Sequence, residues 1–198
     1  MNRSLLPLLA AALSALLAFA LAAAFAAELP GDSVYRVDAQ MTDSQGNALT
    51  FADAAGHVRL ATLFYASCGY VCPMLIEQIR RIENELDEDE RARLRVLLIT
   101  VDPERDTPEA LAALAQRRKL DTTRWTLAQP ASADLRKLAA VLDVQYRELD
   151  DGEFNHSSVI TLLDPQGRVL ARNSRLAGEP DADFVAALRK ALAAASQE

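Results

Sequence analysis

The sequence predicts an α/β layered domain with a mixed central β-sheet flanked by helices, preceded by an N-terminal β-hairpin. Three observations lead to this prediction. Residues 58–65 and 94–101 are mostly apolar runs with the length of buried strands. A segment with helical periodicity follows each of them. Short apolar segments near both ends of the chain are joined by strong turn signals. Strands that alternate with helices are typical of a layered sheet.

The first half of the domain shows each of these signals in order. Residues 35–41 and 48–51 flank Asp43-Ser44-Gln45-Gly46-Asn47, which predicts a hairpin. A central strand at 58–65 is followed by a helix that starts at Pro73, where the missing N–H costs nothing. This helix is expected to fade in the acidic stretch at 87–90. The residues predicted to face the core from it are Leu75, Ile79, Ile82 and Leu86.

The second half continues the alternation after the strand at 94–101. Thr107 is predicted to cap a helix that has Pro108 at its first position and Arg117-Arg118-Lys119 at its end. A short strand at 125–128 and a helix opened by Ser132 come next. Two strands at 159–163 and 169–172 are joined by a turn, and the last helix covers 181–194. The inward residues of the last two helices are Leu135, Leu138, Leu142, Phe184, Leu188 and Leu192.

The N-terminus predicts export. Met1-Asn2-Arg3 is a short cationic start, and residues 5–27 carry no charge. Residues 1–27 therefore form either a cleaved signal peptide, with Ala24-Phe25-Ala26 as a fitting cleavage site, or a membrane anchor. Both alternatives place the domain outside the cytoplasm, on the periplasmic side. We expect a tether at 28–33 and the folded domain at 34–198.

The charge balance argues against nucleic acid as a partner. The 198-residue chain has a formal net charge of −7, and its densest basic cluster, Arg117-Arg118-Lys119, lies where a helix end favours cations. A broad basic face is what nucleic-acid binding requires. We therefore expect no nucleic-acid partner, and we expect a membrane contact only through an uncleaved N-terminal segment.

Cys68 and Cys72 are the chain's two cysteines, and they lie between a predicted strand and a predicted helix. Reactive groups gather at the carboxyl ends of strands in such sheets, and a helix N-terminus favours thiolate, so their pKa values are expected to fall. A disulfide across so short a loop adds little stability. We therefore interpret the cysteines as a redox-active dithiol rather than a structural bridge.

The spacing of the two cysteines permits two kinds of chemistry. Three intervening residues leave room for a disulfide or for two sulfurs that share one metal ion. Two thiolates alone can hold Cu(I), and one added imidazole gives a site that also accommodates Cu(II). His57 and His156 are the chain's two histidines. From the residues alone, either histidine is more typical of an ordinary loop position than of a metal ligand.

Three segments follow one another along the chain: residues 64–73 with Cys68, Cys72 and Pro73, residues 101–108, and residues 156–167, which begin at His156. They resemble the CxxxCP motif, the VDPERDTP block and the histidine block of the Sco/SenC family, which is involved in copper delivery to cytochrome c oxidase. These blocks occur in the family's order, and the apolar N-terminal segment matches its membrane tether. The resemblance covers about residues 34–195.

The resemblance implies a thioredoxin-like fold and a mononuclear copper site, with Cys68, Cys72 and His156 as the metal ligands. It also implies a client protein, either an oxidase copper-centre subunit or another copper or thiol protein. Asp102 and Arg105 fall in the signature block and are interpreted as structural or as supports of the ligands. The other candidates near the site are Tyr65 and Tyr70, which could line it or be core or loop residues, and Asp106 and Thr107, which are explained by a helix start.

The chain departs from the family pattern near the proposed ligands. Gly69 stands where many members carry proline, which loosens the loop, and Asn155 replaces an aspartate that is common before the histidine. Residues 125–127 lack a glycine that often follows in that block. These changes leave the ligand set intact but put the specialisation for an oxidase in doubt.

Three functions compete at this stage. The first is a copper metallochaperone, and the second is an extracytoplasmic thiol-disulfide reductase that acts on a client protein's cysteines. A peroxidase of similar fold is the third, although such enzymes use one attacking cysteine in a different setting. His156 separates the first two functions, because reductase chemistry on this fold does not require an imidazole.

Overall fold

The computed structural model describes residues 29–69 and 71–196 of the chain. The predicted export segment at 1–27 and the candidate site residue Tyr70 lie outside the described residues. Within those two ranges, no helix has the length and apolar character needed to cross a bilayer.

A seven-stranded mixed sheet forms the centre of the domain, in the order β2-β1-β5-β4-β3-β8-β9. The inner strands β3, β4 and β5 are parallel, whereas β1, β8 and β9 join the sheet by antiparallel pairing. This confirms the predicted sheet. Its strands are β1 (Gln40–Asp43), β2 (Ala48–Thr50), β3 (Arg59–Phe64), β4 (Arg95–Thr100), β5 (Trp125–Pro130), β8 (Ile160–Leu163) and β9 (Val169–Asn173).

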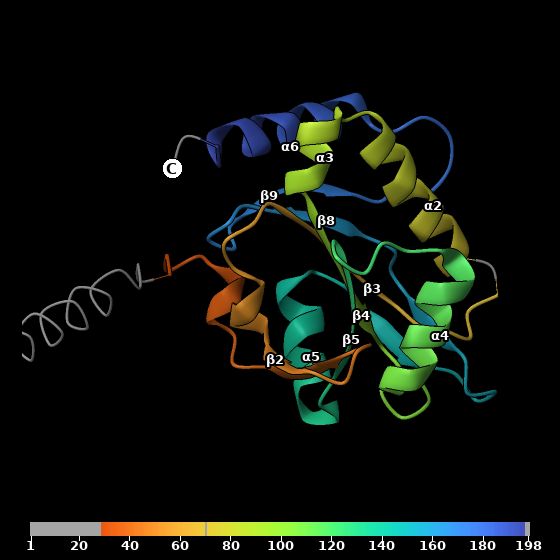
Figure 1. Cartoon of the computed structure of the whole chain (residues 1–198). Coiled ribbons are helices and arrows are strands. Elements are labelled where there is room, and N and C mark those ends of the chain that lie inside the picture. Colours follow the sequence, from red (N-terminus) through yellow and green to blue (C-terminus); the bar gives the residue numbers. More distant parts are fainter. Residues whose placement is uncertain (1–28, 70, 197–198) are drawn as a thin grey trace, which may run out of the picture.

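Helices flank this sheet, as predicted. The helix α2 lies beside α4, α3 lies beside α6 with β9 next to it, and α5 lies near β2 and the N-terminal turns (Figure 1). The elements are α2 (Val71–Asn84), α3 (Glu88–Arg93), α4 (Pro108–Arg118), α5 (Ser132–Val141), α6 (Ala182–Ala194) and two short 3-10 helices, η1 (Val34–Arg36) and η2 (Phe51–Ala54).

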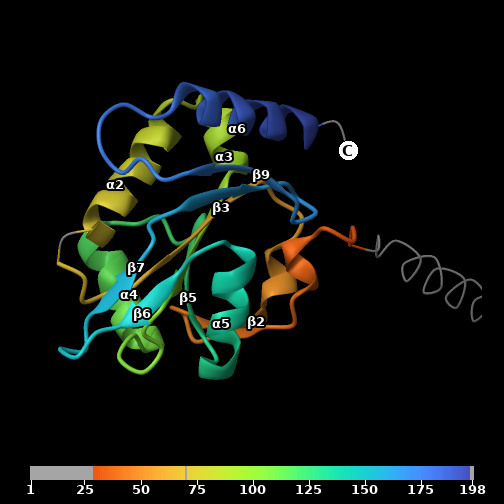
Figure 2. The same ribbon diagram turned by 180° about the vertical axis from the view of Figure 1, so that it is seen from behind.

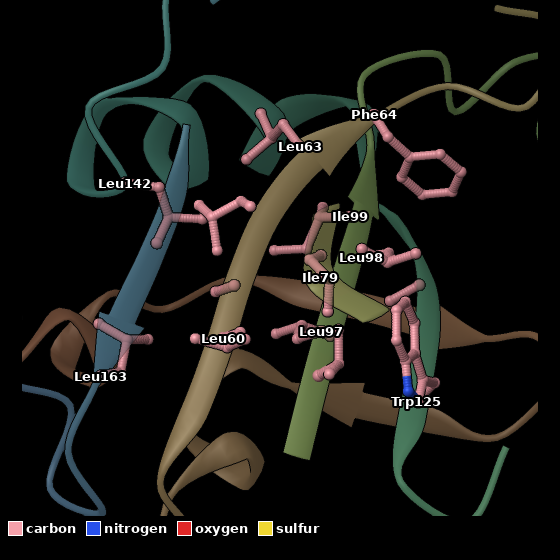
Figure 3. Close-up of a cluster of buried hydrophobic side chains, with 14 of the residues drawn as sticks. Leu60, Leu63, Phe64, Ile79, Leu97, Leu98, Ile99, Trp125, Leu142 and Leu163 are labelled. Atoms are coloured by element: carbon pink, nitrogen blue, oxygen red, sulfur yellow. The ribbon is translucent and has the colours of Figure 1, made fainter. Parts of the chain in front are cut away.

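The hydrophobic core lies around β3 and β4. Every residue of β3 is buried, and in β4 only Arg95 is partly exposed, as the two apolar runs predict. Figure 3 shows side chains of these strands packed with Ile79 of α2, Trp125 of β5 and Leu163 of β8. The inward residues predicted for the helices are all buried, which confirms the helical periodicity.

Two local elements differ from the prediction. The strand predicted at 35–41 begins only at Gln40, and residues 34–36 form η1 instead, where the Ser33 side chain accepts a hydrogen bond from the Tyr35 N–H. The acidic stretch at 87–90 does not end a helix; it begins α3. Asp87 accepts a hydrogen bond from the Glu90 N–H, and the Glu90 carboxylate accepts one from the Asp87 N–H, so the two residues form a capping box.

A second, two-stranded sheet is absent from the sequence prediction. It consists of β6 (Tyr146–Glu148) and β7 (Phe154–His156), an antiparallel hairpin that projects beside the starts of α2 and α4 (Figure 2). Its connection contains Asp151-Gly152, and Gly152 has the positive φ of 79° that glycine tolerates. His156 is therefore the last residue of a strand and not a loop residue.

The register of the parallel strands brings the functional segments to one edge. Phe64 at the end of β3 pairs with Thr100 at the end of β4. The carboxyl ends of parallel strands meet at the same edge of a sheet. The loop that carries Cys68 and the loop at 101–106 therefore start next to each other.

The core assignment predicts the effect of a cavity in β4. Leu98→Ala should lower the free energy of unfolding by about 2–5 kcal/mol, because the side chain is fully buried and its removal leaves a void. Leu170→Ala is the control, because Leu170 is 45% exposed and should change the stability by about 0.5 kcal/mol or less. Urea unfolding measures both. Equal losses in the two variants would contradict this core.

Candidate metal centre

The two cysteines lie on either side of the start of α2. Cys68 is half-buried in the loop after β3, and Cys72 lies in the first helical turn with 3% of its surface exposed. The Cys72 N–H points at the Cys68 sulfur, with the nitrogen 3.3 Å from Sγ. The sulfur thus occupies the position of a helix-capping acceptor. No disulfide joins the two residues.

His156 approaches the buried cysteine from the β6–β7 hairpin. Its Nε2 lies 4.0 Å from the Cys72 Sγ, and its Nδ1 lies 3.2 Å from the Ser157 carbonyl oxygen. A carbonyl oxygen can only accept a hydrogen bond, so Nδ1 carries the proton in this arrangement. Nε2 then directs its lone pair towards the sulfur, which is the tautomer that a metal ligand needs.

Burial sets the charge states of both groups. Desolvation lowers the pKa of His156, although its hydrogen bond to Ser157 opposes this, so the ring is neutral at neutral pH. Desolvation also raises the pKa of the Cys72 thiol, with a smaller contribution from the nearby Cys68. The prediction of a lowered cysteine pKa is therefore wrong for Cys72, because burial outweighs the helix N-terminus there.

The side chains of Cys68, Cys72 and His156 fit a soft metal ion in chemistry, and the distance between Cys72 and His156 is close to that of two ligands. Two donors of one metal ion at zinc-like bond lengths lie about 3.6–3.8 Å apart, so the 4.0 Å between Cys72 and His156 is a few tenths too wide. In the present arrangement, residues 29–69 and 71–196 contain no cluster of three or more His, Cys, Asp or Glu side chains able to hold a metal.

Tyr65 connects the cysteine segment to the hairpin. Its hydroxyl lies 3.0 Å from the Glu153 carboxylate and 3.3 Å from the Phe154 carbonyl oxygen. Its ring centroid is 5.8 Å from that of His156 and 5.7 Å from that of Phe154. Of the alternatives open for Tyr65, the structure supports a position that lines the site.

Asp106 has a role that the sequence analysis missed. Thr107 alone caps α4, by accepting a hydrogen bond from the Ala110 N–H. Asp106 is buried, and its carboxylate accepts from the Ala66 N–H at 2.8 Å and from the Thr100 hydroxyl. It therefore holds the beginning of the cysteine loop. The signal in the sequence was an aspartate placed one residue before a helix cap that Thr107 already provides.

Asp102 and Arg105 form an ion pair in the same loop. Asp102 is buried, whereas the Arg105 side chain is 46% exposed. The Arg105 guanidinium also donates a hydrogen bond to the Gly152 carbonyl oxygen at the tip of the hairpin. These contacts agree with the interpretation of the pair as structural or as a support of the ligands.

His57 is remote from the cysteines. It is an exposed residue in the turn before β3, whereas Cys68 follows the other end of that strand. A six-residue strand is about 20 Å long, so His57 cannot reach the sulfurs. Its interpretation as an ordinary loop residue is confirmed. Gly69 and Asn155, the two departures from the family pattern, are both exposed.

Comparison with known proteins identifies relatives of the whole domain. The family model described as SCO1/SenC matches residues 30–193. The SCO1 protein homolog of Bacillus subtilis (strain 168) is 23% identical over 152 residues, which cover 75% of this chain and 78% of that protein.

Two solved structures show the same fold. ScoI of Bradyrhizobium japonicum, solved with copper bound, has a TM-score of 0.65 and 24% identity over 78% of this chain and 98% of its own. BsSco is described as a member of the Sco family of cytochrome c oxidase assembly proteins with a disulfide switch. It has a TM-score of 0.68 and 20% identity over 82% of this chain and 95% of its own.

The role of Asp106 predicts a graded loss of stability. Asp106→Ala should lower the free energy of unfolding by about 1–3 kcal/mol, because it leaves the Ala66 N–H and the Thr100 hydroxyl without their acceptor. Asp106→Asn should cost less, because its amide oxygen still accepts. Chemical denaturation of the metal-free protein measures the difference. An alanine variant as stable as the asparagine variant would rule out this role.

Proposed function

The chain belongs to the SCO1/SenC family, and on that premise we propose that it is a copper metallochaperone. It binds one copper ion through Cys68, Cys72 and His156 for the assembly of a respiratory oxidase copper centre. One observation carries the proposal: Nε2 of His156 lies 4.0 Å from the Cys72 sulfur although 84 positions separate the two residues in sequence.

Copper is the ion that the protein carries in this proposal, and its binding displaces protons from the cysteine thiols. Cys72 is a protonated thiol in the metal-free protein because its pKa is raised by burial. Metal binding to thiols releases their protons and leaves thiolates. The positive charge of the ion then compensates the negative charge of the buried thiolate. His156 is already neutral and needs to lose no proton from Nε2.

The donor set suits both oxidation states of copper. Two thiolates satisfy Cu(I), and the imidazole extends the set for Cu(II). Cys68 is the more exposed of the two sulfurs. We propose that the ion leaves through Cys68, by stepwise exchange with donors of the client protein. The client is an oxidase copper-centre subunit or another copper protein, met on the periplasmic side of the membrane after export through residues 1–27.

The arrangement of the cysteines also favours a second candidate, a thiol-disulfide reductase. Cys68 is only half-buried and lies at a helix N-terminus, whereas Cys72 is buried. In this function the Cys68 thiolate attacks a client disulfide, and Cys72 then displaces the client's second thiol. Two electrons pass to the client, and the chain is left with a Cys68–Cys72 disulfide.

Removal of the imidazole separates the two functions. His156→Ala should weaken Cu(II) binding by more than the roughly 10–100-fold that loss of a supporting residue costs, because it deletes a ligand. Oxidation of the dithiol should stay within about twofold of the wild type, since it involves only the sulfurs. Competition titration with a Cu(II) chelator and a thiol assay measure the two properties.

His57→Ala is the matched control for this experiment, because it removes the other histidine, which is exposed and lies at the opposite end of β3. It should bind Cu(II) as the wild type does. The three-ligand proposal fails if His156→Ala and His57→Ala bind Cu(II) equally well.

Removal of either sulfur should abolish both functions. Cys68→Ser and Cys72→Ser each leave a single cysteine, which cannot form the internal disulfide and cannot hold Cu(I) between two sulfurs. Cu(I) competition titration and reduction of a model disulfide substrate measure the losses. If either serine variant keeps wild-type Cu(I) affinity, a shared two-sulfur site is excluded.

A further inference from the structure

We propose that Arg105 is a positioning residue for the proposed copper site: it fastens the β6–β7 hairpin to the β4–α4 loop and thereby holds His156 near Cys72. This inference rests on the proposed function and adds to it a residue that lies outside the ligand set. It also gives the exposed end of the Arg105 side chain a role beyond the ion pair with Asp102.

In the β4–α4 loop, residues 101–107, a buried and hydrogen-bonded aspartate orients Arg105. Asp102 is buried, and its backbone N–H donates to the Thr100 hydroxyl oxygen at 3.0 Å. Its carboxylate accepts from both the backbone N–H and the Nε of Arg105. Asp102 thus holds the backbone N–H and the Nε of Arg105, and the two terminal nitrogens of the guanidinium remain available for other contacts.

The outer part of the guanidinium contacts the hairpin at two points. It donates a hydrogen bond to the Gly152 carbonyl oxygen at the tip, and its central carbon lies 5.8 Å from the centroid of the Phe154 ring. The latter distance is within the range of a cation–π interaction. Arg105 therefore bridges Asp102 on the domain and two residues of the hairpin.

The contact between Arg105 and Phe154 affects the position of His156 because both residues lie on β7. Phe154 and His156 are two residues apart on a strand, so their side chains point to the same face. Arg105 and Tyr65 both contact Phe154, and this fixes the face that presents the imidazole to the sulfur. Tyr65, at the end of β3, contacts the hairpin from one side, and Arg105, after the end of β4, contacts it from the other.

Hydrogen exchange in the metal-free protein tests, without any copper, whether Arg105 stabilises the β6–β7 hairpin. In Arg105→Ala, the amides of Leu149 and Ser157, which close the hairpin, should exchange roughly tenfold faster. The amides of β4 should exchange as in the wild type, which shows that the domain stays folded. Unchanged exchange at Leu149 and Ser157 would overturn the proposal.

Copper affinity tests whether the contact between Arg105 and the hairpin supports copper binding. Arg105→Ala should weaken Cu(II) binding by about 10–100-fold, as loss of a residue that orients a ligand does. Arg105→Lys keeps the charge but loses the planar fork, so its loss should be intermediate. Cu(I) affinity should fall less than Cu(II) affinity, because two thiolates alone can hold Cu(I).

Arg189→Ala is the matched control. Its side chain is 49% exposed, forms an ion pair with Glu90 and donates to the Glu85 carbonyl oxygen, but it joins α6 to α3 and to the turn between α2 and α3. It should leave both hairpin exchange and Cu(II) affinity unchanged. If Arg189→Ala and Arg105→Ala lose Cu(II) affinity equally, Arg105 affects the affinity only through the overall stability of the domain. That result would overturn the proposal.

A double-mutant cycle shows whether Arg105 acts through His156. In a His156→Ala background, Arg105→Ala should change the Cu(II) Kd by less than about twofold, because the group it positions is gone. A full 10–100-fold effect in that background would overturn the positioning role. Failure of the proposed function itself is recognised separately, since His156→Ala alone would then bind Cu(II) as the wild type does.

Discussion

Cys72 and His156 are separated by 84 positions in the chain, and their side chains meet because one hairpin packs against the first turn of one helix. The sheet register places the end of β3, and therefore the start of α2, beside the end of β4. Contacts from both strand ends then hold the hairpin, through Tyr65 on one side and Arg105 on the other. The proposed chemistry depends on this docking, since without it the chain keeps a dithiol but has no imidazole near it.

The electrostatics of the metal-free site explain how a buried thiol can serve as a ligand. Burial keeps Cys72 protonated and His156 neutral, so neither side chain carries an unpaired charge in this poorly solvated place. In the proposed function, a copper ion displaces the thiol protons and compensates the negative charges of the two sulfurs. The same burial makes Cys72 a poor nucleophile on its own. In the proposed reductase reaction, the first attack therefore belongs to the more exposed Cys68.

The sequence predicts the sheet and most helices well, because long apolar runs and capping residues are local signals. The strand β4 and the cap at Thr107 are examples. The hairpin that carries His156 was missed because its strands are three residues long and only partly buried, which leaves no clear alternation to detect. The raised pKa of Cys72 could not be predicted either. The helix N-terminus is visible in the sequence, whereas the burial that outweighs it comes from tertiary packing. Asp106 is a further case, since its partner Ala66 lies forty positions away.

X-ray absorption spectroscopy of the copper-loaded domain tests the central claim most directly, because it counts the atoms bound to the ion. The account predicts one copper per chain, with two sulfur neighbours and one imidazole nitrogen in the Cu(II) form. A spectrum with two sulfurs and no imidazole would contradict the docking of His156 as a ligand. A spectrum without sulfur would contradict the site as a whole.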